Sequence, residues 1–147
     1  MHDNVEHLRI QLACLKDSRL PPIEQNSMRF FERMAIDDGF DGMGLGEEAE
    51  RGSRLLGDKP ILLMGNHGLL VAAPSVAQAF DDLYYFERAC EVYITALATG
   101  RELHVASDEV ARKTCRQWLE YPGVTDKHFN ALMEILDEEE PVYRQLN

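Results

Sequence analysis

Basic side chains are scarce in this sequence. Its 147 residues include 15 lysines and arginines against 26 aspartates and glutamates, which gives a formal net charge of −11. Binding to nucleic acid depends on clustered basic side chains that neutralise phosphates, so this scarcity argues against a nucleic-acid partner. Part of the acidity is local, in the run Asp137–Glu140, which is typical of a solvated helix end.

Long apolar runs and paired cysteines are also missing. No stretch approaches the roughly 20 apolar residues of a membrane-spanning helix, and residues 1–4 lack the features of a signal peptide. Cys14, Cys90 and Cys115 are widely spaced, so neither a disulfide framework nor a thiolate zinc site is indicated. We therefore expect reduced, mostly buried thiols in a cytoplasmic protein with no membrane partner.

The remaining composition is that of an ordinary globular protein. Hydrophobic residues make up 45% of the chain and charged residues 28%, and the length suits one domain over 1–147. Apolar residues at helical spacing, with caps and glycine stops, predict helices, and two continuous apolar runs predict buried strands. The expected strands are 61–64 and 69–72. The expected helices are 5–16, 46–56 and 75–100, the last with a capping box formed by Ser75 and Gln78. Two further helices are expected after these, one capped by Ser107, with Val110, Thr114 and Trp118 on its inner face, and one capped by Thr125.

Two segments before these strands leave alternatives open. Residues 28–36 fit a strand or a short helix, and we favour the strand. The stretch Asp37–Gly44 is rich in aspartate and glycine, which is typical of a loop. Calcium binding is an alternative use of such a loop, but the spacing departs from the EF-hand pattern. We therefore expect a connecting loop.

The turn between the two apolar runs carries the residue best suited to chemistry. His67 follows Asn66 and is flanked by Gly65 and Gly68, which permit a sharp turn and leave room for a ligand. A neutral imidazole there could bind zinc through one nitrogen while a hydrogen bond fixes the other. The alternative is a histidine that only hydrogen-bonds within a tight turn. The residues alone leave both interpretations open, and we expect His67 to lie in a cleft.

Several segments around this turn form one ordered pattern. They are Pro60–Val71, the following helix with Ala77, Phe80 and Glu87, the upstream Leu12–Leu15 with Leu20–Pro22, and the glycine-rich loop before Glu47 and Glu48. In this order they resemble the class II aldolase/adducin family, most strongly over residues 11–100. The resemblance implies an α/β fold, a three-layer α/β/α domain with a mostly antiparallel sheet, incomplete here at its N-terminus.

The resemblance also implies a metal site and a class of reaction. The family's divalent metal, usually zinc, is held by three histidines, and the one from the Asn-His-Gly turn is His67 here. The metal would polarise an oxygen of a small sugar-phosphate or carboxylate substrate as a Lewis acid. The site usually lies at a subunit interface of a tetramer. We therefore expect a metal-dependent carbon–carbon lyase, of the aldolase or decarboxylase type, that forms a homo-oligomer.

The sequence departs from the family at the other two metal ligands. They normally form a His-x-His pair, at positions that fall here on Asp3 and Val5. His2 and His7 lie nearby, but at a spacing of five residues they do not share one face of a strand or a helix. The family's catalytic acid lies still further upstream, so no catalytic residue is assigned. The alternatives are a truncated or non-catalytic, adducin-like domain for assembly or protein binding, or a site completed by another chain.

Other conspicuous side chains receive structural interpretations. We expect His104 and His128 to be surface or hydrogen-bonded histidines. Tyr84–Phe86 fit a core or interface patch on the long helix, and Trp118 fits a core anchor.

Overall fold

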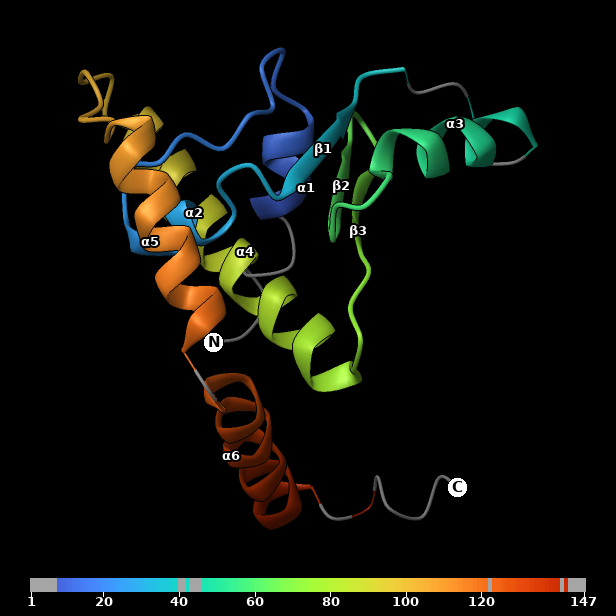
Figure 1. Ribbon diagram of the computed structural model, residues 1–147, viewed down its shortest axis with the longest axis vertical. Helices are drawn as coiled ribbons and strands as arrows, with labels where there is room; N and C mark the ends of the chain where they lie inside the picture. Colours follow the sequence, from blue (N-terminus) through green and yellow to red (C-terminus); the bar gives the residue numbers. More distant parts are fainter. Residues whose placement is uncertain (1–7, 40–41, 43–45, 122, 141, 143–147) are drawn as a thin grey trace.

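The computed structural model describes residues 8–39, 42, 46–121, 123–140 and 142, and the first part of the expected helix 5–16 lies outside them. The predicted helices at 46–56 and 75–100 and both predicted strands are confirmed to within about two residues. In chain order the elements are α1 (Leu8–Ala13), α2 (Gln25–Arg29), β1 (Met34–Asp37), α3 (Glu47–Leu56), β2 (Ile61–Met64), β3 (Gly68–Val71), α4 (Val76–Ala98), α5 (Asp108–Glu120) and α6 (Val124–Glu139) (Figure 1).

The strands form a mixed sheet in the order β1–β2–β3. β1 runs parallel to β2, with Met34 opposite Ile61, and β2 runs antiparallel to β3, with Ile61 opposite Val71. A parallel pair needs a crossover connection, and α3 lies in the connection between β1 and β2. The described strands therefore have one pairing of each kind, and a mostly antiparallel sheet is not confirmed for them. The coarser prediction of an α/β fold is confirmed.

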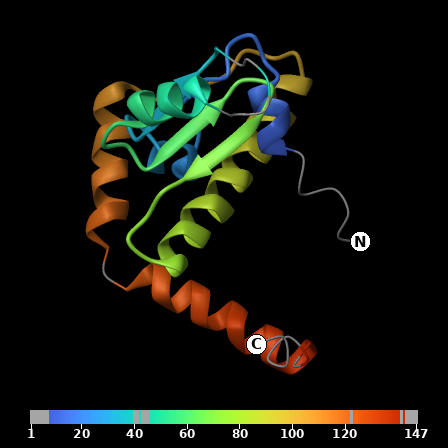
Figure 2. The same cartoon turned by 90° about the vertical axis from the view of Figure 1, so that its right-hand side faces the viewer.

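The two faces of the sheet are covered by different helices. Successive side chains of a strand point to opposite faces. Ile61 and Leu63 face the main core, where α1 and α4 contribute further apolar side chains. Leu62 points the other way, towards α3, and a Cβ added to Gly52 would lie 3.5 Å from its Cδ2 atom. Figure 2 shows this sheet between α3 on one face and α4 on the other.

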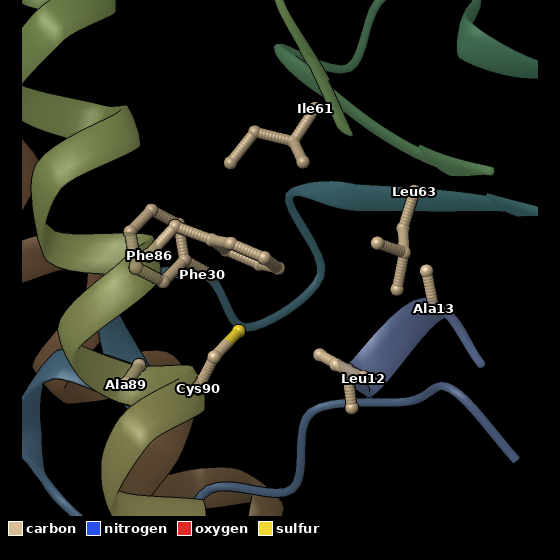
Figure 3. Close-up of a cluster of buried hydrophobic side chains, with 8 residues drawn as sticks. All are labelled: Leu12, Ala13, Phe30, Ile61, Leu63, Phe86, Ala89 and Cys90. Carbon is tan, nitrogen blue, oxygen red and sulfur yellow. The ribbon is translucent and has the colours of Figure 1, made fainter. Parts of the chain in front are cut away.

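The core joins elements that are far apart in the sequence (Figure 3). Leu12 of α1 and Phe86 of α4 are fully buried, and the ring of Phe30 meets that of Phe86 edge-on at 5.2 Å. Fully burying a leucine or phenylalanine side chain contributes roughly 2 kcal/mol to the free energy of unfolding. This core therefore holds α1, the end of α2 and α4 together behind the sheet. It comprises Leu12, Ala13, Phe30, Ile61, Leu63, Phe86, Ala89 and Cys90.

A capping box explains why residues 28–36 do not begin as a strand. The Glu24 carboxylate accepts the backbone N–H of Ser27 at 2.6 Å, and Ser27 Oγ accepts the backbone N–H of Glu24 at 3.1 Å. This reciprocal pair starts a helical turn. Glu32 then takes a positive φ of 61°, and the strand begins only at Met34. The strand prediction is therefore wrong for the first half of this segment and confirmed for the second.

Two further helix starts differ from expectation in their side-chain partners. Ser75 caps α4, as predicted, by accepting the N–H of Gln78 at 3.2 Å. The Gln78 side chain, however, donates to Asp82 at 3.3 Å and does not complete the capping box. α6 begins after Gly123, so Thr125 is not its cap, and its hydroxyl instead lies near polar groups of α4.

The buried face of α5 is shifted by one residue from the predicted one. Val110 was expected to face inward but is 49% exposed, whereas Ala111 and Cys115 are buried. The thiol of Cys115 donates to the backbone oxygen of Arg29 at 3.2 Å, which orients this face towards α2. Ser107 caps α5 as predicted.

α4 is the longest described helix and connects the sheet to the C-terminal region. α6 packs near the start of α4 and then runs away from the sheet (Figure 2). Among the described helices, α4 included, none has the length and apolar character needed to cross a lipid bilayer.

Candidate functional site

The turn between β2 and β3 is held in place by two other elements. The N–H of Gly65 donates to the backbone oxygen of Asp37, at the end of β1, at 2.7 Å. The N–H of Asn66 donates to the backbone oxygen of Ala13, at the end of α1, at 3.0 Å. Both donors belong to the backbone, so the position of the turn depends little on side-chain rotamers. The next residue is His67.

The residue types at the turn match its geometry. Asn66 has a φ of 57°, in the left-handed region that asparagine tolerates better than most residues. Gly68 has a φ of 153°, which also lies in the range that disfavours side chains. At Gly65 a Cβ would meet the backbone oxygen of Asp37 at 3.4 Å, so the glycine allows the close approach of β1. The sequence Gly-Asn-His-Gly therefore folds into a turn that presents the imidazole.

His67 lies at a cavity of about 420 Å³ between α3 and the sheet, as predicted. Its side chain is exposed, which places it at the mouth of this cavity. We call this cavity the α3 cavity. Its lining is mainly apolar, from Ala49, Gly52, Leu56, Leu62, Met64 and Leu70, and Asp37, Glu48, Ser53 and His67 add polar atoms.

The acidic groups of the α3 cavity are bound to one arginine. Arg51 Nη2 lies 3.0 Å from Asp37 Oδ2 and 3.4 Å from Glu48 Oε1. Burial by itself would raise the pKa of Asp37. The hydrogen bonds from Arg51 and from the N–H of Gly39 outweigh burial and hold that pKa below its ordinary value. Asp37 is therefore an ionised, structurally engaged carboxylate and not a proton donor at neutral pH.

The described residues do not complete a metal site around His67. Within them no group of three or more histidine, cysteine, aspartate or glutamate side chains is arranged to hold a metal ion. His104 is exposed, and His128 is hydrogen-bonded to Asp81. Both agree with the prediction that these residues are surface or hydrogen-bonded histidines. The candidate ligands His2 and His7 lie outside the described residues. One imidazole by itself does not fit the three protein ligands of a catalytic zinc site.

Sequence reasoning missed the role of Arg51. The spacing Glu48–Arg51 on the predicted helix was a signal for a helical ion pair. The longer contact from Arg51 to Asp37 joins α3 to the end of β1, and no local pattern indicates such a contact. The expected loop Asp37–Gly44 begins one residue later than predicted, because Asp37 is the last residue of β1. Residues 40, 41 and 43–45 of this loop lie outside the described residues.

A family profile described as the class II aldolase and adducin N-terminal domain matches residues 7–94, more than half of the chain. The chain belongs to the class II aldolase and adducin family. The resemblance inferred from the Asn-His-Gly turn and its surroundings is thereby confirmed.

Some proteins similar to this chain have names that state an activity. Decarboxylase NovR of Streptomyces niveus is 35% identical over 101 residues, which cover 67% of this chain and 37% of NovR. A crystal structure of an aldolase II superfamily protein from Pseudomonas syringae is 34% identical with a TM-score of 0.84, and the match covers 93% of this chain and 55% of that one. The structure of an L-fuculose 1-phosphate aldolase from Glaciozyma antarctica shares the fold, with a TM-score of 0.72 and 20% identity. The match covers 90% of this chain and 50% of the aldolase chain.

The relatives are longer than this chain. It is 32% identical to a curated relative from Caulobacter vibrioides and spans 38% of the length of that protein. It is 31% identical to a second curated relative, from Pseudomonas aeruginosa, and spans 54% of its length. The matched region therefore corresponds to part of each relative.

Proposed function

We propose that this chain contributes the His67 turn to a metal-dependent carbon–carbon lyase of the class II aldolase type. The observation that carries the proposal is the placement of His67 on a rigidly held turn at the mouth of the α3 cavity. A small sugar-phosphate or carboxylate is the substrate class we infer, and the names of the decarboxylase and fuculose-phosphate aldolase relatives support it. No described residue is assigned a catalytic proton transfer.

A divalent metal such as zinc requires ligands beyond His67. The described residues supply one imidazole, so two further ligands would come from His2, His7 or another copy of the chain. This requirement supports a homo-oligomer. The exposed position of His67 is compatible with sharing a metal across an interface.

The finer features of the fold form part of the same proposal. We infer a single domain over 1–147 with a three-layer α/β/α arrangement. The packing of α3 on one face of the sheet and of α1 and α4 on the other supports the layers. We also infer that the protein acts in the cytoplasm on a small molecule.

A non-catalytic, adducin-like domain for assembly or protein binding is the second candidate. The specific observation in its favour is that no cluster of three ligands surrounds His67 among the described residues. In that case the Gly-Asn-His-Gly turn serves only to join β2 and β3. Fold alone does not separate the two candidates.

Metal content of the purified protein tests the proposal. By inductively coupled plasma mass spectrometry, we expect the wild-type protein to contain close to one zinc ion per chain. The His67→Ala variant should contain no zinc. His104→Ala is the matched control, because His104 is also exposed but does not line the α3 cavity. Absence of bound metal from the wild type after incubation with zinc would refute the lyase proposal and favour the assembly function.

A further inference from the structure

A second cavity lies at the other end of β3 from His67. His67 precedes β3, whereas Ser75 follows it and lines this second cavity, which has a volume of about 310 Å³. The cavity is formed where the end of α2 and the end of α5 meet the starts of α4 and α6. We call it the arginine cavity. It is lined by Arg29, Arg33, Ser75, Gln78, Trp118, Leu119, Tyr121, Gly123, Thr125 and Asp126.

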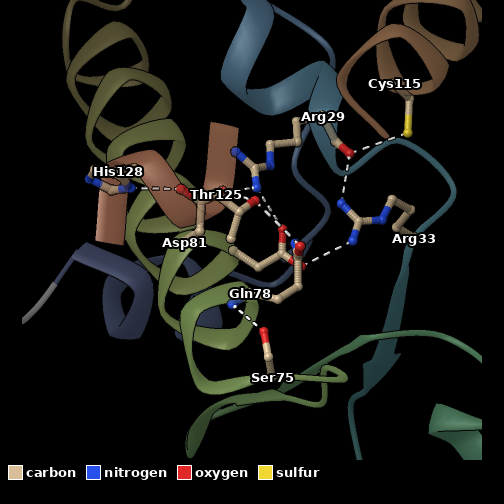
Figure 4. A network of polar contacts seen from close by, with 9 residues as sticks. Arg29, Arg33, Ser75, Gln78, Asp81, Cys115, Thr125 and His128 are labelled. Carbon is tan, nitrogen blue, oxygen red and sulfur yellow. Dashed lines mark hydrogen bonds and ion pairs between the residues drawn. The ribbon is translucent and has the colours of Figure 1, made fainter. Parts of the chain in front are cut away.

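Buried carboxylates fix the first of its two arginines (Figure 4). The Arg29 side chain is 6% exposed, and its Nη2 atom contacts Asp81 and, at 3.0 Å, Asp82. These two carboxylates are 0% and 1% exposed. The guanidinium of Arg29 also lies 5.5 Å from the centre of the Trp118 ring. A charged group this deeply buried is costly unless it is paired, so its orientation is well determined.

The second arginine is held by the same group of residues. Arg33 Nη2 lies 3.1 Å from Asp82, and Arg33 Nη1 donates to the backbone oxygen of Arg29 at 3.3 Å. Arg33 also lines a neighbouring cavity of about 290 Å³, to which Asp82 contributes. The two cavities adjoin, because Arg33, Ser75, Gln78 and Leu119 line both.

Both guanidinium groups keep hydrogen-bond donors that the carboxylates do not use. Among the described residues, the Nε and Nη1 atoms of Arg29 and the Nε atom of Arg33 have no hydrogen-bond acceptor. An arginine has five N–H donors. The unused nitrogens are not among the described buried atoms that lack a partner, so they keep some contact with solvent. The Arg29 side chain is more than nine-tenths buried and lines the cavity, so an acceptor inside the cavity could take the place of solvent at these nitrogens.

The starts of two long helices add to the donor character of the arginine cavity. Ser75 begins α4; its Oγ accepts the N–H of Gln78, which leaves the hydroxyl hydrogen available. Gly123 begins α6 and provides no side-chain cap for the N–H groups of the first turn. Helix N-termini carry a partial positive charge. Asp126 is the one carboxylate among the residues that line the cavity.

We propose that the arginine cavity binds a small oxyanion, a carboxylate or phosphate group of a small metabolite. Asp81 and Asp82 balance the formal charges of Arg29 and Arg33, so binding relies on the unused N–H and O–H donors and on the helix starts. Because the carboxylate of Asp126 repels an anion, we expect a moderate affinity. The site is distinct from the His67 turn and does not depend on the lyase proposal.

Trp118 provides a direct probe of this site, because it is the only tryptophan in the sequence and it lines the cavity. We expect titration with inorganic phosphate or with succinate to change its fluorescence in a saturable manner. Sodium chloride at matched ionic strength should not do so. The two titrations also show whether a phosphate or a carboxylate is preferred. The absence of a saturable change with either anion would overturn the proposal.

Two variants with opposite effects separate binding from folding. Arg33→Gln should weaken binding about tenfold, because it removes a charge-assisted donor. Asp126 is exposed, and Asp126→Asn removes the carboxylate that repels the anion. This variant should therefore bind the anion about threefold more tightly. Arg112→Gln is the matched control, since Arg112 pairs with Glu32 on the surface and does not line the cavity.

Circular dichroism establishes that each variant is folded. If Arg33→Gln does not fold, the stronger binding by Asp126→Asn remains a decisive readout, because a purely structural ion-pair network would not produce it. Equal affinities in wild type, Asp126→Asn and Arg112→Gln would contradict the proposal.

Discussion

The Nδ1 atom of His128 lies 2.6 Å from Oδ1 of Asp81, and this contact joins α6 to α4. The Asp81 side chain is fully buried and also contacts Arg29 and the hydroxyl of Thr125, at 3.3 Å in the latter case. The imidazole of His128 lies 4.8 Å from the ring of Tyr84. A single buried carboxylate thus connects α2, α4 and α6.

Removing the imidazole should loosen α6. We expect His128→Ala to lower the free energy of unfolding by about 2 kcal/mol, because it deletes a hydrogen bond to a buried charged group. Hydrogen exchange should become faster in α6 and remain unchanged in β2. His104→Ala serves as control and should have no effect, because His104 is exposed. Equal exchange rates in His128→Ala and wild type would show that the contact between His128 and Asp81 does not hold α6 in place.

Acid stability should depend on Arg51. The folded-state pKa of Asp37 lies below its ordinary value of 3.8, so the ionised carboxylate stabilises the fold above that pH. This contribution is lost as the pH falls through the lowered, folded-state pKa. In Arg51→Gln burial raises the pKa of Asp37, and acid unfolding should begin at a higher pH. Far-UV circular dichroism between about pH 2 and 7 measures the midpoint.

Arg54→Gln is the control for this experiment. Arg54 lies on the same helix, but its ion pair with Glu50 is largely exposed and contributes little. Equal acid midpoints for Arg51→Gln and Arg54→Gln would show that the Asp37 pair does not determine acid stability.

The backbone of Asn66 should tolerate glycine but not a β-branched residue. We expect Asn66→Gly to leave the free energy of unfolding within about 0.5 kcal/mol of wild type and Asn66→Val to lower it by about 2 kcal/mol, because valine disfavours a φ of 57°. Urea denaturation measures both. Asn130→Val, the same change on a helical and exposed residue, should have a small effect. A tolerated valine at Asn66 would mean that the turn adopts another conformation.

The three thiols should react at different rates. Cys14 is exposed, whereas Cys90 and Cys115 are buried. Burial also raises the pKa of Cys115, so its thiol remains protonated and unreactive near pH 8. We expect an aromatic disulfide reagent to modify one thiol rapidly in the native protein and the other two only on unfolding. Cys14→Ser should abolish the rapid phase, and a rapid phase that persists would contradict the burial of the other thiols.

Local sequence patterns predicted the elements with strong periodicity or clear ends. The run Ile61–Met64 is continuous and apolar because both faces of β2 are covered, and α4 begins with a serine cap. The cleft position of His67 followed from the glycines beside it. The face of α5 could not be predicted to the residue, because Val110 and Ala111 differ little in pattern and the choice depends on the contact of Cys115 with Arg29.

Contacts between distant segments were not predictable in this way. The bond from Asn66 to Ala13 involves only backbone atoms, so no residue type signals it. The pairing of Arg29 and Arg33 with Asp81 and Asp82 buries three charged side chains and partly buries Arg33, against the usual preference of such residues for the surface. Sequence periodicity therefore located the candidate turn and missed the arginine cavity.

The parallel pairing of β1 with β2 sets the order in which the His67 turn becomes rigid during folding. β2 and β3 are joined by a short turn, so their pairing closes a small loop at little entropic cost. β1 reaches β2 only after the crossover through α3, which closes a much longer loop. The bond from Gly65 to Asp37 can form only in that later step. We therefore expect the hairpin to form before the bond that constrains its tip, so that the final position of the imidazole is set after the β2–β3 pairing.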